Sequence, residues 1–211
     1  YLYSSPSAIY EEIKDKSIII TPHRFPENKK HLEKKSGIYN AGNIIFRNDD
    51  NAIECLKEWR GQCLDWCYDY LDNGRLGDQM YLNNWSEKYK NVYILNHKGV
   101  NLGSWNISSY RIKKLDAKIY VDDEPLLWYH FHSLKLYEGI GGEIKTPPVF
   151  LINKDIYEPY LKNLSLLAKE IKKLYPGFNF GIDNKPPMIK IIKQRLEREM
   201  PKFFHFFKTD K

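Results

Sequence analysis

The sequence has no hydrophobic run long enough to cross a membrane. Its longest β-branched run, Ile18-Ile19-Ile20, falls far short of the roughly 18–20 apolar residues that a bilayer requires. The chain opens on Tyr1-Leu2-Tyr3, with neither an initiating Met nor the basic segment of a signal peptide. These absences favour a cytoplasmic protein, or one that is peripheral to the membrane, and they suggest that residue 1 is not the natural start.

Cysteine is also scarce, with three residues in 211. Cys55, Cys63 and Cys67 fall within one helical pattern, and no His or Cys accompanies them at zinc-finger spacing. Three thiols are a poor basis for a disulfide framework. We therefore expect buried, reduced cysteines of a cytosolic protein, without a chemical role.

The formal net charge of +6 is unevenly placed, because eight Lys or Arg and only three acidic residues lie between Lys185 and Lys211. A basic tail suits a membrane surface or an acidic partner, and a solvated helix face explains it equally well. The rest of the chain is close to neutral, so we expect no nucleic-acid partner.

The hydrophobic pattern alternates between strand and helix signals, which predicts an α/β fold. The isoleucine run predicts a buried strand at Ser17–Thr21. Three- and four-residue apolar spacing predicts a helix from Asn51 to about Tyr70, capped by residues 48–50. Further strands are expected at 37–46, 92–95, 118–121 and 126–131, and helices at 8–13 (capped by Ser7), 77–85, 155–175 and 187–200. The organisation predicted is a first domain at 1–145 and a helical, basic and aromatic extension at 146–211.

Two histidines stand near the end of the strand expected at 126–131. Period-two alternation would place His130 and His132 on one face, where two imidazoles can share a divalent metal or where one can orient the other. Lys135 follows within reach of a phosphate. A pair of polar residues at a strand end remains the alternative.

Two further segments could hold a polar substrate. In Asn40-Ala41-Gly42 the small residues allow the backbone to approach a ligand, and the amide can bond a sugar hydroxyl. Asp78 and Gln79 open a short helix, where free backbone N–H groups gather. The alternatives are an asparagine in a bulge and a helix cap formed by Asp78.

In order and spacing, these segments resemble the C-terminal half of GT-A-fold glycosyltransferases, in particular bacterial enzymes related to glycogenin and to the lipooligosaccharide galactosyltransferases. The resemblance covers about residues 1–136. Its motifs are an Asn-Ala-Gly that touches the donor sugar, an Asp-Gln near the anomeric carbon, and a His-rich segment at the metal and diphosphate. Finer matches to the bacterial group lie at 21–25, 63–67 and 101–106.

The resemblance also implies what is missing. Such enzymes hold their metal with a D-x-D motif, and this sequence contains none. In the family that motif directly precedes the segment that matches Tyr1–Pro6. We therefore expect the nucleotide-binding half to lie upstream of residue 1, and this fragment to lack part of the metal site. Ser133 replaces the family's Gly, and Lys135 comes one residue early.

The implied fold is a GT-A-like mixed sheet flanked by helices, followed by the helical extension. The implied activity is transfer of a sugar from a nucleoside-diphosphate donor to a hydroxyl on a glycan or lipid-linked acceptor, with Mn²⁺ or Mg²⁺, and the Asp-Gln motif favours retention of the anomeric configuration. The residues assigned are Asp78 and Gln79 as catalytic, Asn40, Ala41, Gly42 and Lys135 at the donor, Asn101, Trp105 and Asn106 at the acceptor side, and His130 and His132 at the metal.

Two alternatives remain. A non-catalytic carbohydrate-binding or membrane-associated accessory domain would use the aromatic surface and the tail at 186–211. A metal-dependent hydrolase would use the two histidines, but no paired carboxylate lies near them in the sequence.

Overall fold

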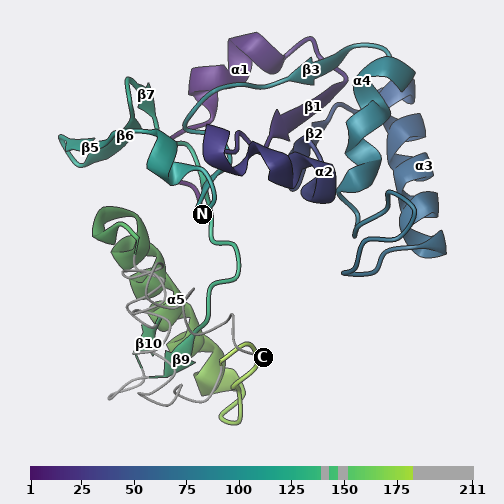
Figure 1. The fold of residues 1–211 in the computed structure, drawn as a ribbon. Coiled ribbons are helices and arrows are strands. Elements are labelled where there is room, and N and C mark those ends of the chain that lie inside the picture. Colours follow the sequence, from purple (N-terminus) through teal and green to yellow (C-terminus); the bar gives the residue numbers. More distant parts are fainter. Residues whose placement is uncertain (139–142, 147–151, 183–211) are drawn as a thin grey trace, which may run out of the picture. The chain divides into compact units, whose positions relative to one another are not determined.

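The computed structural model describes residues 1–138, 143–146 and 152–182 (Figure 1). Two units are distinguished by their internal contacts, Tyr1–Phe131 and the residues from His132 onward. Small sheets and helices are mixed along the first unit, which confirms the predicted α/β class. In the described ranges, no helix has both the length and the apolar character to cross a membrane.

The first unit is built on a three-stranded sheet in the order β2-β1-β3. Strand β1 (Ile18–Pro22) pairs antiparallel with β2 (Tyr39–Phe46) and parallel with β3 (Val92–Ile94). All three isoleucines of β1 are buried. A central strand that is covered on both faces explains the unbroken β-branched run.

The pairing of β1 with β2 contains a bulge. Ile20 lies opposite Ile44, but the next residue, Thr21, lies opposite Asn40. Residues 41–43 are therefore left out of the ladder. The predicted bend of small residues in this strand is confirmed, and it falls at the carboxyl end of β1.

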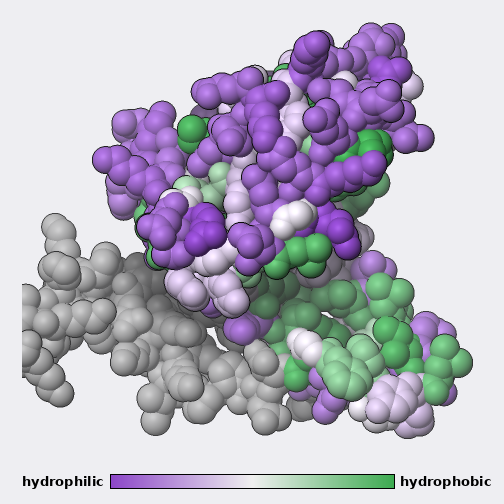
Figure 2. All heavy atoms as spheres, turned by 90° about the vertical axis from the view of Figure 1, so that its right-hand side faces the viewer, coloured by the Kyte–Doolittle hydropathy of each residue, from purple (hydrophilic) through white to green (hydrophobic). Residues whose placement is uncertain are grey.

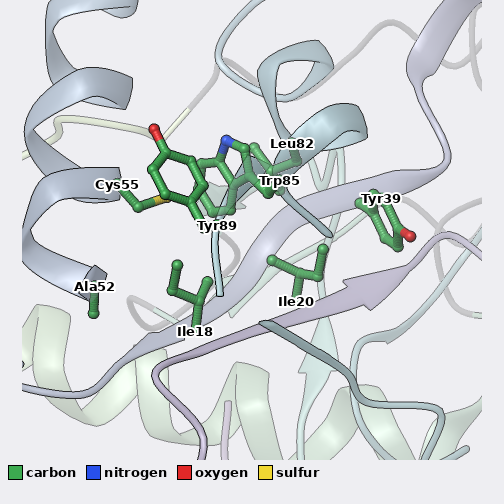
Figure 3. Packing of buried hydrophobic residues seen from close by; sticks show 8 residues of the cluster. All are labelled: Ile18, Ile20, Tyr39, Ala52, Cys55, Leu82, Trp85 and Tyr89. Atoms are coloured by element: carbon green, nitrogen blue, oxygen red, sulfur yellow. The ribbon is translucent and has the colours of Figure 1, made fainter. Parts of the chain in front are cut away.

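One face of the sheet packs against helix α3 (Asp50–Asp65), the short 3-10 helix η2 (Met80–Asn84) and helix α4 (Trp85–Lys88) (Figure 3). The core residues are Ile18, Ile20, Tyr39, Ala52, Cys55, Leu82, Trp85 and Tyr89. Helix α3 begins as predicted, because the Asp49 carboxylate accepts a hydrogen bond from the Ala52 N–H at 2.9 Å.

The other face of the sheet packs on helix α1 (Ser7–Ile13), whose Ile9 joins Ile19 and Leu95 in a second core cluster. The predicted cap of this helix is wrong. Ser7 is the first helical residue, and its own N–H donates to the Ser5 hydroxyl at 3.2 Å. The connection from β1 to β2 contains the 3-10 helix η1 (Glu27–Leu32) and the short helix α2 (Glu33–Ser36).

Helix α3 is shorter than predicted. It ends at Asp65, and Leu64, which was expected on its buried stripe, is 71% exposed. All three cysteines are free, but only Cys55 is buried, whereas Cys63 is half-buried and Cys67 is exposed. The prediction of buried thiols is thus right for one residue of three. Burial raises the pKa of the Cys55 thiol to about 12.

The rest of the first unit consists of short strands. Strand β4 (Leu102–Gly103) pairs in parallel with β8 (Tyr129–His130), and β5 (Ile112–Leu115), β6 (Lys118–Val121) and β7 (Glu124–Pro125) form a meander that follows the 3-10 helix η3 (Ile107–Ser109). The strand expected at 126–131 is only two residues long.

The second unit contains β9 (Tyr137–Glu138) paired antiparallel with β10 (Ile144–Lys145), and helix α5 (Lys154–Leu174). Helix α5 begins and ends within one residue of its predicted bounds. Hydrophobic side chains gather at the surface of this unit (Figure 2), and Leu174 is 91% exposed. The helix predicted at 187–200 and the basic tail at 186–211 lie outside the described residues.

Candidate functional site

The candidate site lies where β1 ends and β2 bulges. Strand β1 delivers Thr21, and the loop after it delivers His23. The bulge delivers Asn40, Ala41 and Gly42, while Gln79 stands just before η2. The segment around β4 and the strand β8 add Asn101, Trp105, Asn106 and His130.

Asn40 and Gln79, which are 39 residues apart in the chain, are joined by a 2.9 Å hydrogen bond from Asn40 Nδ2 to Gln79 Oε1. The Gly42 N–H donates to Asn40 Oδ1 at 2.8 Å, which fixes the orientation of the Asn40 amide. Gln79 Oε1 also accepts from the Ala41 N–H at 3.2 Å, and its Nε2 donates to the Ser36 carbonyl at 2.7 Å. The bulge is therefore held by two side-chain amides.

Asn40 is only 7% exposed, and its second amide hydrogen points to His23 Nε2 at 3.1 Å. Its hydrogen-bonding groups are thus engaged inside the protein. Gln79 is half-buried and Gly42 is exposed. A ligand would consequently meet Gln79 and the backbone at Gly42, while Asn40 holds both in place.

A chain of hydrogen bonds sets the tautomer of His130. The Thr21 hydroxyl donates to the Asn43 carbonyl at 3.3 Å, so it must accept from Asn101 Nδ2 at 3.0 Å. This orients the Asn101 Oδ1 towards His130 Nδ1, at 3.4 Å. An acceptor facing Nδ1 favours the tautomer with the proton on that nitrogen, which leaves the lone pair on Nε2.

His130 also lies against the bulge. A Cβ atom at Gly42 would come within 2.2 Å of His130 Nδ1 and 2.5 Å of Asn40 Oδ1. Distances below about 3.0 Å do not occur between such atoms, so only glycine fits here. The bulge motif and the histidine motif, far apart in sequence, are in direct contact.

The loop that carries Asn101, Trp105 and Asn106 is anchored on His23. The His23 carbonyl accepts from Trp105 Nε1 at 2.8 Å and from Asn106 Nδ2 at 2.9 Å. The Trp105 ring lies edge-on to His130, with centroids 5.1 Å apart. Asn101 and Asn106 are both fully buried, so they shape the site from beneath it, whereas the half-buried Trp105 lies at its rim.

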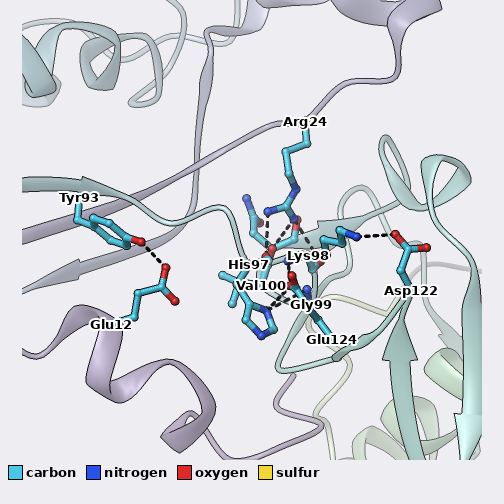
Figure 4. Close-up of polar contacts among 10 residues, drawn as sticks. Glu12, Arg24, Tyr93, His97, Lys98, Gly99, Val100, Asp122 and Glu124 are labelled. Carbon is cyan, nitrogen blue, oxygen red and sulfur yellow. Dashed lines mark hydrogen bonds and ion pairs between the residues drawn. The ribbon is translucent and has the colours of Figure 1, made fainter.

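Arg24 secures the same loop from the side (Figure 4). Its guanidinium donates to the carbonyls of His97, at 3.1 Å, and of Val100. Burial lowers the pKa of Arg24 from its ordinary value, because it penalises the charged form. A half-buried cation whose hydrogen bonds go to backbone carbonyls acts as a structural clamp.

The structure does not place three of the predicted site residues in the candidate site. The Asp78 side chain is exposed, and its backbone carbonyl accepts from Trp59 Nε1 at 2.8 Å. His132 and Lys135 belong to the second unit, so their place beside His130 stays a prediction. The histidines were paired because side chains two residues apart share one face of a strand. That argument does not apply here, because β8 ends at His130 and the chain then turns, with a positive φ of 55° at Ser133.

The metal prediction also stays open. His130 fits the behaviour of a metal-binding imidazole, since its Nδ1 faces an amide oxygen that would orient Nε2. Within the described residues, however, no group of three His, Cys, Asp or Glu side chains could hold an ion. In the described part of the candidate site, His130 Nε2 is therefore one possible metal ligand, and the remaining ligands of a coordination sphere are not present there.

Thr21, His23 and Arg24 are members of the site to which the sequence analysis assigned no individual roles, although they lie in the segment 21–25 that it matched to the bacterial group. The available signal was their position, since polar residues that follow a buried strand lie at the sheet edge where ligands bind.

Comparison with known proteins gives two relatives from Bacillus subtilis (strain 168). The chain is 30% identical over 193 residues to the protein described as "Uncharacterized protein YfnD", which aligns with 86% of this chain and 60% of the relative. It is 31% identical over 191 residues to "Uncharacterized protein YfnF", with 85% and 61% aligned. The chain thus spans about three-fifths of the length of these relatives. Neither a family model nor a solved structure matches it.

Proposed function

We propose that this chain carries the donor-sugar side of a nucleotide-sugar-dependent glycosyltransferase of the GT-A type. The observation that carries the proposal is the hydrogen bond between Asn40 and Gln79, together with the contact between Gly42 and His130. Asn40 and Gln79, predicted at the donor sugar, and His130, predicted at the metal and diphosphate, come from distant parts of the chain and lie together in the first unit.

The chemistry of the site suits a sugar hydroxyl. Gln79 Oε1 and one Nε2 hydrogen are engaged within the protein, so the second Nε2 hydrogen can donate to a sugar oxygen, and the backbone at Gly42 allows close approach. Buried asparagines and Thr21 support these groups from below, so the groups are held in place before a ligand arrives. In the transfer, the bond between the anomeric carbon and the leaving diphosphate oxygen breaks. A bond to the acceptor oxygen forms, and the proton of the acceptor hydroxyl passes to the leaving diphosphate oxygen.

By the resemblance, Gln79 lies nearest the reacting carbon, and Lys135 steadies the leaving phosphate as a point charge. Asp78 is exposed in the structure, so its proposed role would require its side chain to turn towards the donor. A bound Mn²⁺ or Mg²⁺ would neutralise the charge that develops on the diphosphate, and His130 would supply one ligand from this chain.

The test is turnover of a panel of UDP- and GDP-sugars with Mn²⁺, using the protein at its full encoded length. We expect release of the nucleoside diphosphate from at least one donor, and a loss of about a hundredfold in kcat/KM for Gln79→Ala. Gln62→Ala is the matched control and should keep full turnover, because the Gln62 side chain donates to Glu58 of the same helix at 3.2 Å.

Donor turnover that is absent across the panel would sink the proposal, as would equal turnover in the two glutamine variants. Binding of oligosaccharides without any donor turnover would instead favour the non-catalytic accessory domain.

A further inference from the structure

A second polar and aromatic surface lies on the loop between α3 and η2, residues 66–78, which we name the aromatic loop. Trp66 is its anchor, being 7% exposed. The Trp66 carbonyl accepts from the Tyr81 hydroxyl at 2.8 Å, and the Arg75 guanidinium carbon lies 4.8 Å from the centre of the indole ring. The loop is therefore fastened to the first unit by a buried side chain.

The loop is also closed internally. Asp72 and Arg75 exchange two backbone hydrogen bonds of 3.0 and 2.8 Å across Asn73-Gly74, whose positive φ values of 47° and 78° suit a tight hairpin turn. The Gly77 N–H donates a hydrogen bond to the Tyr68 carbonyl at 2.8 Å. Because the backbone of this loop is already held in one conformation, binding a ligand there costs little conformational entropy.

What the loop presents is a pair of tyrosines. The rings of Tyr68 and Tyr70 are stacked, with centroids 5.6 Å apart and an interplanar angle of 24°. Both lie edge-on to Trp66, yet they are 56% and 55% exposed. In the part of the chain that the structure describes, neither phenol hydroxyl has a hydrogen-bond partner, and the exposed Asp69 carboxylate between them has no ion pair.

Aromatic rings that are more than half exposed, beside unused hydroxyl and carboxylate groups, match the chemistry of a saccharide. The negative face of an aromatic ring attracts the polarised C–H groups on the apolar side of a sugar ring, and neighbouring oxygens bond its hydroxyls. A protein partner would need roughly 800 Å² of contact surface, which two tyrosine rings do not supply.

We propose that Tyr68 and Tyr70 form the platform that binds an oligosaccharide acceptor. The aromatic loop is connected to the candidate site along the chain, because residue 78 is followed directly by Gln79. The Trp59 indole holds the Asp78 carbonyl at that junction. The acceptor role rests on the proposed glycosyl transfer, whereas saccharide binding to the two rings can be measured without it.

The probes are soluble tetrasaccharides of glucose, N-acetylglucosamine, mannose and galactose, observed by saturation-transfer NMR and titration calorimetry. We expect the wild-type protein to bind at least one of them at millimolar concentration. Tyr68→Ala and Tyr70→Ala should each weaken Kd about tenfold, while Tyr68→Phe and Tyr70→Phe, which keep the rings, should retain most of the binding. The control is Tyr10→Ala, because Tyr10 is equally exposed, at 59%, and lies on α1.

Thermal unfolding of each variant shows that it is folded, as expected for exposed side chains. The proposal is overturned if no tetrasaccharide binds the wild type, or if the alanine variants and Tyr10→Ala bind equally well. Donor hydrolysis separates the two ideas, because it uses water and needs no saccharide acceptor; it should be unchanged in the control variant Tyr10→Ala. If donor turnover is absent while tetrasaccharide binding depends on the two rings, the platform stands and the transferase proposal fails.

Discussion

Gly42 lies directly against His130: a methyl group on the Gly42 Cα would sit 2.2 Å from the imidazole Nδ1. The bulge of β2 and the strand β8 approach each other this closely because no side chain stands between them. The contact joins two motifs that are 88 positions apart in the sequence, and it makes the glycine a test of the site's architecture.

We predict that Gly42→Ala destabilises the protein by about 1–3 kcal/mol, because the added methyl forces His130 and the Asn40 amide apart. Gly61→Ala is the opposite case, since Gly61 lies inside helix α3 with open space around its Cα. That change should stabilise the protein by about 0.5–1 kcal/mol. Urea unfolding of the wild-type protein and of the two variants measures both changes in the free energy of unfolding. Equal stabilities for the two variants would contradict the close contact.

Arg24→Met removes the clamp of the loop at 97–101. Each buried acceptor that loses its donor costs about 1–3 kcal/mol, and the methionine keeps much of the apolar bulk. We expect a loss of about 3 kcal/mol in the free energy of unfolding. Arg60→Met, at an exposed position on α3, should change it by less than about 0.5 kcal/mol. If the two variants unfold alike, the guanidinium does not hold this loop.

The cysteines should differ in reactivity, in the order of their exposure. Desolvation raises the pKa of Cys63 to about 11 and that of Cys55 to about 12. At pH 8 Cys63 is then roughly one part in a thousand thiolate, because each pH unit below the pKa reduces the thiolate tenfold. Iodoacetamide should label the exposed Cys67 first, and Cys67→Ser should remove the fast phase.

Raising the pH towards 11 should accelerate labelling of Cys63, because the thiolate is the reactive form and its fraction rises about tenfold per pH unit below the pKa. Peptide mapping by mass spectrometry identifies the modified thiol. Fast labelling of Cys63 at pH 8 in the Cys67→Ser variant would contradict the burial of that thiol.

Short-range sequence patterns predicted the strands and helices whose formation depends mainly on their own residues. The isoleucine run specifies a central strand whatever surrounds it, and an aspartate before an amphipathic segment starts helix α3. The end of α3 was not predictable in this way. Apolar spacing continues to Leu71, but the chain turns at Trp66, which is extended (φ −154°, ψ 123°) and buried. Its packing against Arg75 and Tyr81 overrides the helical pattern.

The candidate site was predicted as separate segments. Their chemistry could be read from the residue types, since an amide beside small residues suits a polar ligand. Their contacts depend on the register of the strands, as in the bulge that places Thr21 opposite Asn40. No local pattern encodes such a register. The histidine pair illustrates the limit, because alternation applies only while a strand continues, and β8 stops at His130.

The Asn40 amide provides the sharpest test of the hydrogen-bond network. Asn40→Asp conserves shape and keeps the acceptor for the Gly42 N–H, but it replaces the Nδ2 donor by an oxygen. That oxygen would face Gln79 Oε1, which lies 2.9 Å from the present nitrogen. Two facing acceptors at a position that is 7% exposed should cost about 2–3 kcal/mol at pH 7.

The loss should depend on pH, with a sign that follows from the same geometry. The His23 Nε2 also faces this position, at 3.1 Å, so the comparison is made with His23→Phe in both proteins, which removes that imidazole. Burial and the facing oxygen then disfavour the carboxylate, so the pKa of Asp at this position should lie above its unfolded value of about 3.9. The protonated acid can donate to Gln79 again. Stability of the variant relative to wild type should therefore be best below about pH 4 and should fall as the pH rises through the folded pKa. Asn96→Asp, at an exposed position, should show no such trend. Urea unfolding of both variants between pH 4 and 8 measures the difference. A flat profile for Asn40→Asp would mean that the Asn40 nitrogen does not donate to Gln79 in the folded protein.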